Sequence, residues 1–127
     1  MSYHVEEGAR PWDIVFWTRN RTCASQELQS LLEVLSDRDA ADLLLRIGVL
    51  AYPPRDGEYL CRVVADLVEV YAMPVPRMRN GFVLLGAHVA MRKLYVLGTE
   101  MRDGQGHYAV CEKATKEGAL LLESLSR

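Results

Sequence analysis

The sequence predicts an α+β domain, in which a small, mainly antiparallel sheet follows an N-terminal helical hairpin and precedes one C-terminal helix. Leucines recur at helical spacing before Pro53, short β-branched runs fill residues 60–98, and apolar residues return to helical spacing from about His107. The expected order is β-α-α-β-β-β-α. A chain of 127 residues, half of them apolar, suits one domain with a real core, and residues 1–10 are expected to fray.

The first strand and the two helices are expected in the N-terminal half. Residues 11–17 are rich in β-branched and aromatic side chains, which is typical of a strand. A helix capped by Ser25 follows, with leucines at i, i+3, i+4 and i+7 up to Leu35. Residues 36–39 form a capping-box pattern that starts a second helix, and the two prolines at 53–54 end it.

Short strands and a closing helix are expected after a turn at residues 55–58. Residues 60–64 are predicted as a short strand or an extended arm, and residues 66–73 as a strand. Two nearly continuous apolar runs, 82–89 and 92–98, are typical of strands buried on both faces. The closing helix repeats apolar residues every three or four positions, so we expect one of its faces to dock on the sheet.

Charge and hydropathy exclude several classes of protein. A net charge of −2 at pH 7 gives no bulk electrostatic attraction to nucleic acid. No apolar run approaches the roughly 20 residues that cross a bilayer, and no basic segment followed by an apolar core opens the chain. We therefore expect a cytoplasmic protein without membrane contact.

Three cysteines, Cys23, Cys61 and Cys111, stand far apart and form no C-x-x-C motif. An odd, scattered set argues against a disulfide framework and against a zinc site. We expect reduced and mostly buried thiols. Cys111 lies four residues after His107, so the two would face each other on a helix, but no third group is evident to orient them as nucleophile and base.

Cations are unevenly distributed along this acidic chain. Residues 77–93 contain three arginines and a lysine but no acid, and Arg102 follows soon after. A local basic face on a protein of near-neutral charge can hold a phosphate backbone. The alternative is a solvated set of charges at strand ends.

The chain resembles a known family in its order of elements and in three runs: Leu-Val-Glu-Val-Tyr at 67–71, Gly-Phe-Val-Leu-Leu at 81–85 and Leu-Tyr-Val-Leu-Gly at 94–98. From about Trp12 to Leu125 it is similar to the small ribonuclease toxins of bacterial toxin–antitoxin systems, the RelE and HigB-like superfamily with its phage-derived Gp49-like branch. The resemblance implies a RelE-like fold and an endoribonuclease, an mRNA interferase, that needs neither metal nor cofactor. It also implies an antitoxin protein and mRNA or the ribosome as partners.

The resemblance assigns roles to the segment after the last strand. In ribosome-dependent members, an arginine after that strand and a tyrosine at the start of the closing helix act on the scissile phosphate, and Arg102 and Tyr108 match that context. Cleavage of RNA by its own 2′-hydroxyl needs a base, an acid and cations that stabilise the charged phosphorane. Tyr108 or His107 would carry protons, and guanidinium groups suit the charge. The expected phosphate-binding residues are Arg77, Arg79, Arg92 and Lys93.

Two positions depart from the family's pattern. Val83 stands where the family carries an arginine, and residues 99–102 replace a Lys-Lys-Thr run. The alternative is a non-catalytic interaction or mobile-element accessory protein on the same scaffold, in which Tyr108 packs its ring as the first aromatic of a docked helix. An unpaired sheet edge also allows a homodimer. His88, inside an apolar strand, is expected to be hydrogen-bonded rather than a ligand or base.

Overall fold

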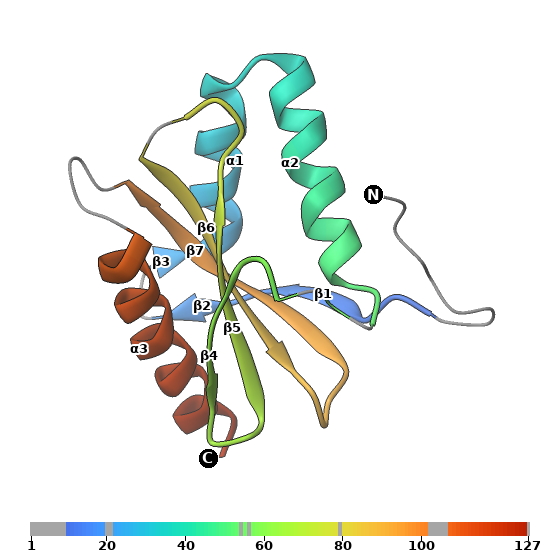
Figure 1. Cartoon of the computed structure of the whole chain (residues 1–127), viewed down its shortest axis with the longest axis vertical. Coiled ribbons are helices and arrows are strands. Elements are labelled where there is room, and N and C mark those ends of the chain that lie inside the picture. The colour runs from blue at the N-terminus through green and yellow to red at the C-terminus, as the bar shows by residue number, and fades with distance from the viewer. Residues whose placement is uncertain are drawn as a thin grey trace.

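The computed structural model describes residues 10–19, 22–53, 55, 57–78, 80–101 and 107–126. The chain forms an α+β fold (Figure 1). The helices are α1 (Ala24–Val34), α2 (Asp37–Leu50) and α3 (His107–Leu125). The strands are β1 (Asp13–Phe16), β2 (Thr18–Arg19), β3 (Thr22–Cys23), β4 (Leu60–Val64), β5 (Val68–Pro74), β6 (Gly81–His88) and β7 (Lys93–Met101). None of the helices in the described ranges has the length and apolarity that a membrane crossing needs.

A mostly antiparallel sheet of five strands, in the order β1-β7-β6-β5-β4, forms the centre of the fold. Strands β4 to β7 pair antiparallel in sequence order, whereas β1 lies parallel to β7, with Asp13 opposite Lys93. The predicted α+β class, the helical hairpin and the C-terminal helix are confirmed. Residues 60–64, expected as a short strand or an extended arm, form the edge strand β4. The structure also contains a separate β2–β3 ladder that the sequence did not predict, because strands of two residues leave no periodic pattern.

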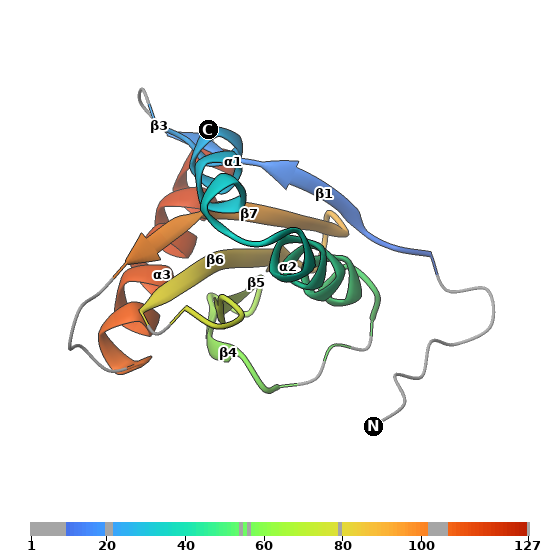
Figure 2. The same ribbon diagram turned by 90° about the horizontal axis from the view of Figure 1, so that it is seen from above.

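Apolar side chains divide between two cores, one on each face of the sheet. Helices α1 and α2 lie on one side of the sheet and α3 lies on the other (Figure 2). On β7, Leu94 packs against the core beneath α1 and α2, and its neighbour Tyr95 packs against the core beneath α3. The segment around β1 divides in the same way, because Trp12 joins the first core and Trp17 the second. This alternation follows from the period of two in a strand and explains the nearly continuous apolar runs of β6 and β7.

Of the two helix N-caps predicted from the sequence, Ser36 is confirmed and Ser25 is not. The backbone N–H of Asp39 donates to Ser36 Oγ at 3.2 Å, as the capping-box pattern predicts. The Asp39 carboxylate, however, forms an ion pair with Arg77 instead of returning to the cap. The prediction that Ser25 caps the first helix is wrong, because α1 already begins at Ala24. Cys23 occupies the N-cap position and forms no side-chain cap bond.

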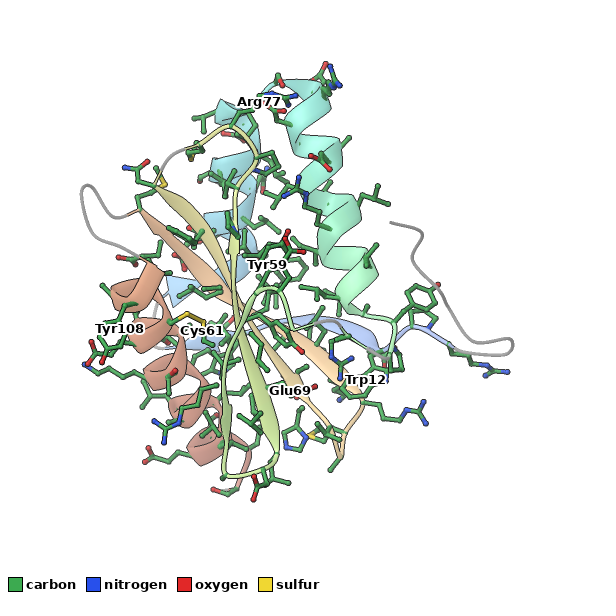
Figure 3. The ribbon with its side chains drawn as sticks, in the orientation of Figure 1. Trp12, Tyr59, Cys61, Glu69, Arg77 and Tyr108 are labelled. Atoms are coloured by element: carbon green, nitrogen blue, oxygen red, sulfur yellow. A yellow bond between two sulfur atoms is a disulfide. The ribbon has the colours of Figure 1, made fainter. Side chains whose placement is uncertain are left out.

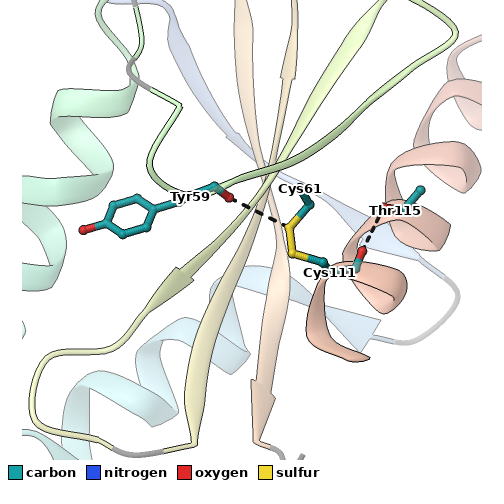
Figure 4. Close-up of a disulfide and its surroundings, with 4 residues drawn as sticks. All are labelled: Tyr59, Cys61, Cys111 and Thr115. Atoms are coloured by element: carbon teal, nitrogen blue, oxygen red, sulfur yellow. Dashed lines mark hydrogen bonds between the residues drawn. A yellow bond between two sulfur atoms is a disulfide. The ribbon is translucent and has the colours of Figure 1, made fainter. Parts of the chain in front are cut away.

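A disulfide between Cys61 and Cys111 joins β4 to α3, with the two Cα atoms 5.3 Å apart (Figure 4). The expectation of three reduced cysteines is therefore wrong for this pair, and Cys23 is the free thiol. The two bonded cysteines are 50 residues apart, and that spacing does not reveal that β4 and α3 pack together. The bond also removes Cys111 as a nucleophile for His107.

Helix α3 approaches the sheet most closely at Gly118. A Cβ atom added there would lie 2.6 Å from Val70 Cγ2, closer than non-bonded carbons normally come. Val70 lies in β5 and is fully buried, so it cannot move aside freely. The absence of a side chain at Gly118 therefore sets the distance between α3 and the sheet.

Arg55 links three elements of the first core. Its guanidinium carbon lies 3.9 Å from the centre of the Trp12 ring, a cation–π contact. Its Nη2 and Nε donate to Glu69 Oε1 at 2.9 and 3.2 Å, and its Nη1 donates to the Leu50 carbonyl at 3.4 Å. The Arg55 side chain is almost fully buried, and it joins the start of β1, the end of α2 and β5 in one charge-assisted cluster. Figure 3 labels two of its members, Trp12 and Glu69.

The substitution Gly118→Ala is expected to destabilise the chain even though alanine favours helices. Overpacking costs about 1–3 kcal/mol, and the gain in helix propensity offsets at most about 1 kcal/mol. Gly48→Ala is the matched control, because that helical glycine has no atom within 4 Å of its Cβ position. Urea unfolding in dilute protein should show a loss for Gly118→Ala and no loss for Gly48→Ala. Equal effects of the two substitutions would contradict the close approach.

The substitution Arg55→Lys is expected to lower the free energy of unfolding by about 1–3 kcal/mol, because lysine keeps the charge but loses the forked hydrogen bonds. Arg46→Lys is the control, since Arg46 forms a partly exposed pair with Asp42 on one helix. That control should change stability by no more than about 0.5 kcal/mol. Thermal or urea unfolding that ranks the two variants equally would refute the role of Arg55.

Candidate functional site

An open groove of about 580 Å³ lies at the end of the sheet where β7 finishes. One wall is the face of α1 that runs from Cys23 to Val34, and Met78 from the loop after β5 contributes another part. Thr99 and Met101 of β7 complete the lining. Apolar side chains from Leu31, Val34, Met78 and Met101 alternate in this lining with polar ones such as Gln26 and Ser30. Adaptable methionines beside polar groups suit a protein or peptide partner.

Glu27 reaches the groove because Gly98 has no side chain. A Cβ at Gly98 would lie 3.2 Å from Glu27 Oε2, and the φ of Gly98 is +151°, a conformation that side-chain-bearing residues rarely adopt. Glu27 Oε1 in turn accepts the backbone N–H of Thr99 at 3.4 Å. The carboxylate is therefore held between α1 and β7 and gives this part of the groove an acidic character.

Cys23 is the most nucleophilic side chain in the groove. Its Sγ lies 2.9 Å from Ser25 Oγ, and Thr18 Oγ1 donates to it at 3.7 Å. Hydrogen bonds lower the pKa of the Cys23 thiol to about 7. The Ser25 hydroxyl is the largest cause, followed by Thr18 and the backbone N–H groups of Gln26 and Ser25. The signal for this property in the sequence is a cysteine directly before a helix, where N–H groups stabilise a thiolate.

The structure places Tyr108 in the first turn of α3, with 83% of its surface exposed (Figure 3). The alternative in which this ring packs as a docking aromatic is therefore wrong. His107 begins the same helix, and its side chain is not among the described parts. Arg102 and Arg79 both lie outside the described residues.

Arg77 lies in the loop between β5 and β6, where its φ of 57° turns the backbone into the left-handed region. Its guanidinium forms an ion pair with Asp39 at the start of α2. Figure 3 shows Arg77 on the side of the helical hairpin and Tyr108 on the outer side of α3. The two residues belong to the same end of the sheet, because Gly81 of β6 pairs with Met101 of β7 there, but they do not face each other.

Arg92 and Lys93 lie at the opposite end of the sheet, in and after the turn that joins β6 to β7. An antiparallel hairpin has its turn at one end and both free ends at the other, so these two residues cannot join Arg77. The expected phosphate-binding set is thus not brought together as one basic face. His88, at the same turn, is buried and accepts the backbone N–H of Met91 through Nδ1 at 3.2 Å, which confirms a hydrogen-bonded histidine.

Glu100 and Lys113 connect the end of β7 with α3 through an ion pair. Lys113 is one turn and a half beyond Tyr108 on the same helix, and its charge is offset by that carboxylate. Five positions along α3 place Lys113 on a different side of the helix from Tyr108, so this paired cation does not border the tyrosine.

Comparisons with family models, with curated proteins and with solved structures find no match for this chain. Function is therefore inferred from the residues themselves. Two features of the described chain bear on it: the exposed Tyr108 after the last strand, and the groove with Cys23 at one end.

The alkylation of Cys23 tests the lowered pKa directly. In non-reducing buffer, the rate of reaction with iodoacetamide should rise with pH and reach half its maximum at about pH 7 rather than near 9. Ser25→Ala should move this midpoint upward, and Ser30→Ala, a groove serine with no bond to the thiol, should not.

Since the folded-state pKa is depressed, the thiolate stabilises the fold above about pH 9, and this contribution is lost as the pH falls through about 7. A midpoint that Ser25→Ala leaves unchanged would contradict the assignment.

Proposed function

We propose that the chain is a toxin-like, metal-independent endoribonuclease on a RelE/HigB-like scaffold, an mRNA interferase of a toxin–antitoxin module. The observation that carries the proposal is Tyr108, exposed in the first turn of the helix that follows the last strand of the sheet. A phenol held in solvent by a helix start has no packing role there. It is free to meet a substrate that docks on this end of the sheet.

The arrangement of elements gives further support. A helical hairpin covers one face of the sheet, the strands that follow pair in sequence order, and a single helix covers the other face. The resemblance to the RelE and HigB-like toxins implies this order. The extra edge strand β4 adds to the order without interrupting it.

The proposed reaction needs only proton transfer and charge stabilisation. The 2′-oxygen of RNA forms a bond to phosphorus and loses its proton to a base, and the bond to the 5′-oxygen breaks as that oxygen receives a proton. The products are a 2′,3′-cyclic phosphate and a 5′-hydroxyl. Tyr108 and His107 are proposed for the proton transfers, and Arg102 for the charge on the phosphorane.

Arg77 and Arg79 are proposed to hold a phosphate of the same RNA strand other than the one that is cleaved. Arg77 is largely exposed although its partner Asp39 is buried, so the guanidinium can donate to a phosphate from its solvent side while the ion pair with Asp39 remains. Arg92 and Lys93, at the other end of the sheet, would then contact RNA only at a distance from the cleavage point. On this proposal the chain works in the cytoplasm beside the ribosome, and an antitoxin covers the end of the sheet around Tyr108.

A second candidate is a partner-binding protein without catalytic activity. Val83, where the family carries an arginine, is fully buried in the core beneath the hairpin, so a charge at this position would be costly. The groove beside α1 combines exposed apolar side chains with an acid and has no cation in its described lining, which suits a peptide better than RNA. The Cys61–Cys111 disulfide also favours this candidate, because disulfides are rare in the reducing cytoplasm.

Inducible expression in bacteria distinguishes the two candidates. Wild type should arrest growth and leave cleaved messages in total RNA, whereas the double variant Arg102→Ala, Tyr108→Phe should allow growth. Loss of a transition-state donor or a proton carrier lowers cleavage by about a hundredfold or more. Arg62→Ala, which removes an exposed arginine from β4, is the control and should remain toxic.

Arrest that persists in the double variant would contradict the assigned residues. Normal growth with intact RNA, from wild type that accumulates as soluble protein, would contradict the enzyme and favour the partner-binding candidate. Retention of one host protein by wild type, and its loss on Val34→Lys in the groove, would then support that candidate.

A further inference from the structure

Cys61 occupies an irregular point of the edge strand β4. Leu60 lies opposite Tyr71 of β5. Arg62, two residues further along β4, lies opposite Val70, which is only one residue from Tyr71. Cys61 is therefore the extra residue of a β-bulge, a position at which the hydrogen-bond ladder is locally disrupted. The disulfide to α3 holds β4 at the point where its pairing with β5 is interrupted.

Few other side chains hold β4 in place. Leu60, Arg62 and Val63 are exposed, whereas Cys61 and Val64 are the two residues of the strand that pack against the core beneath α3. As the last strand of the sheet, β4 also has a neighbouring strand on one side alone. An edge strand with so few buried contacts belongs to the part of a fold that opens locally at the lowest free energy.

Helix α3 keeps its place through contacts that do not involve the disulfide. Three of its side chains are fully buried in the core between the helix and the sheet: Val110, Ala114 and Leu121. Lys113 also forms an ion pair with Glu100 of β7. Loss of the bond between Cys61 and Cys111 therefore releases β4 more readily than α3.

The structure provides an acceptor for the reduced form of Cys61. The carbonyl oxygen of Tyr59 lies 3.8 Å from Cys61 Sγ (Figure 4). A disulfide sulfur has no proton to donate, whereas a thiol is a weak donor, so this contact becomes a hydrogen bond only after reduction. Cys61 and Cys111 are both partly exposed, which gives a small thiol access to the bond.

We propose that the Cys61–Cys111 pair is a reversible thiol–disulfide switch, which holds β4 on the sheet when oxidised and lets β4 open when reduced. The reductant is a small thiol such as glutathione. Its thiolate attacks one sulfur of the pair, the S–S bond breaks, and the sulfur that leaves takes up a proton. A second thiol then displaces the first from the mixed disulfide. Two electrons thus reduce the pair to two thiols, and the reductant is released as its own disulfide.

Opening of β4 changes the edge that the sheet exposes. The inner strand β5 becomes the edge, and its residues Val68 and Val70, fully buried when β4 is closed, lie beside it. An unpaired edge with apolar side chains is a surface to which another strand can add. The switch does not depend on RNA cleavage, because neither Cys61 nor Cys111 has a role in the proposed reaction.

Hydrogen exchange in glutathione buffers tests the switch. The full chain with Cys23→Ser, which removes the free thiol, is equilibrated in mixtures of reduced and oxidised glutathione. Because loss of any cross-link also lowers the stability of the whole fold, the amides of the β4–β5 ladder are compared with those of α3 in the same sample. On reduction, the ladder amides should gain at least about tenfold in exchange rate relative to the α3 amides. Return to oxidised glutathione should restore slow exchange.

Cys111→Ser in the same background is the permanently open control, and it should show fast ladder exchange at every glutathione ratio. A pair that stays oxidised in all mixtures while the chain is folded would overturn the proposal. Equal acceleration in the ladder and in α3 would also overturn it, because the bond would then stabilise the fold as a whole. Ladder amides that exchange at the same rate before and after reduction would show that the bond does not hold β4.

Discussion

The two inner strands β6 and β7 are buried on both faces, and the rest of the fold is arranged to cover them. The helical hairpin and α3 provide one layer each, and β1 and β5 protect the strand edges. The close contact of Gly118 with Val70 and the Cys61–Cys111 bond fix α3, while Arg55 ties the end of α2 to the sheet. Because these contacts join residues far apart in sequence, the stability of the fold depends on packing across the sheet more than on any one helix.

The antiparallel pairing of β6 and β7 also separates the candidate functional residues between the two ends of the sheet. The β6–β7 hairpin turn carries Arg92 and Lys93, and the opposite end gathers the β5–β6 loop, the groove and the start of α3. This second end combines an exposed tyrosine with two ion pairs.

Local patterns in the sequence predict the elements, and contacts between distant residues determine the site. The bond from Asp39 to Ser36 is local and was predictable, as were the three helices and the buried strands. The Cys61–Cys111 disulfide was not, because no local pattern records which strand lies under a helix. The separation of Arg77 from Lys93 could have been inferred, since the one strand between them was predicted and an antiparallel hairpin separates its turn from its ends. The lowered pKa of Cys23 needs the positions of Ser25 and Thr18 around the thiol, which composition does not give.

The most direct test of RNA cleavage at this end of the sheet is to map the ends of a message in a cell-free translation reaction to which the purified chain is added. Attack by the 2′-hydroxyl predicts new 5′-hydroxyl ends opposite 2′,3′-cyclic phosphates with wild type, and a loss of about a hundredfold or more with Tyr108→Phe. A message without new ends, or new ends that carry a 5′-phosphate, would contradict the proposed reaction.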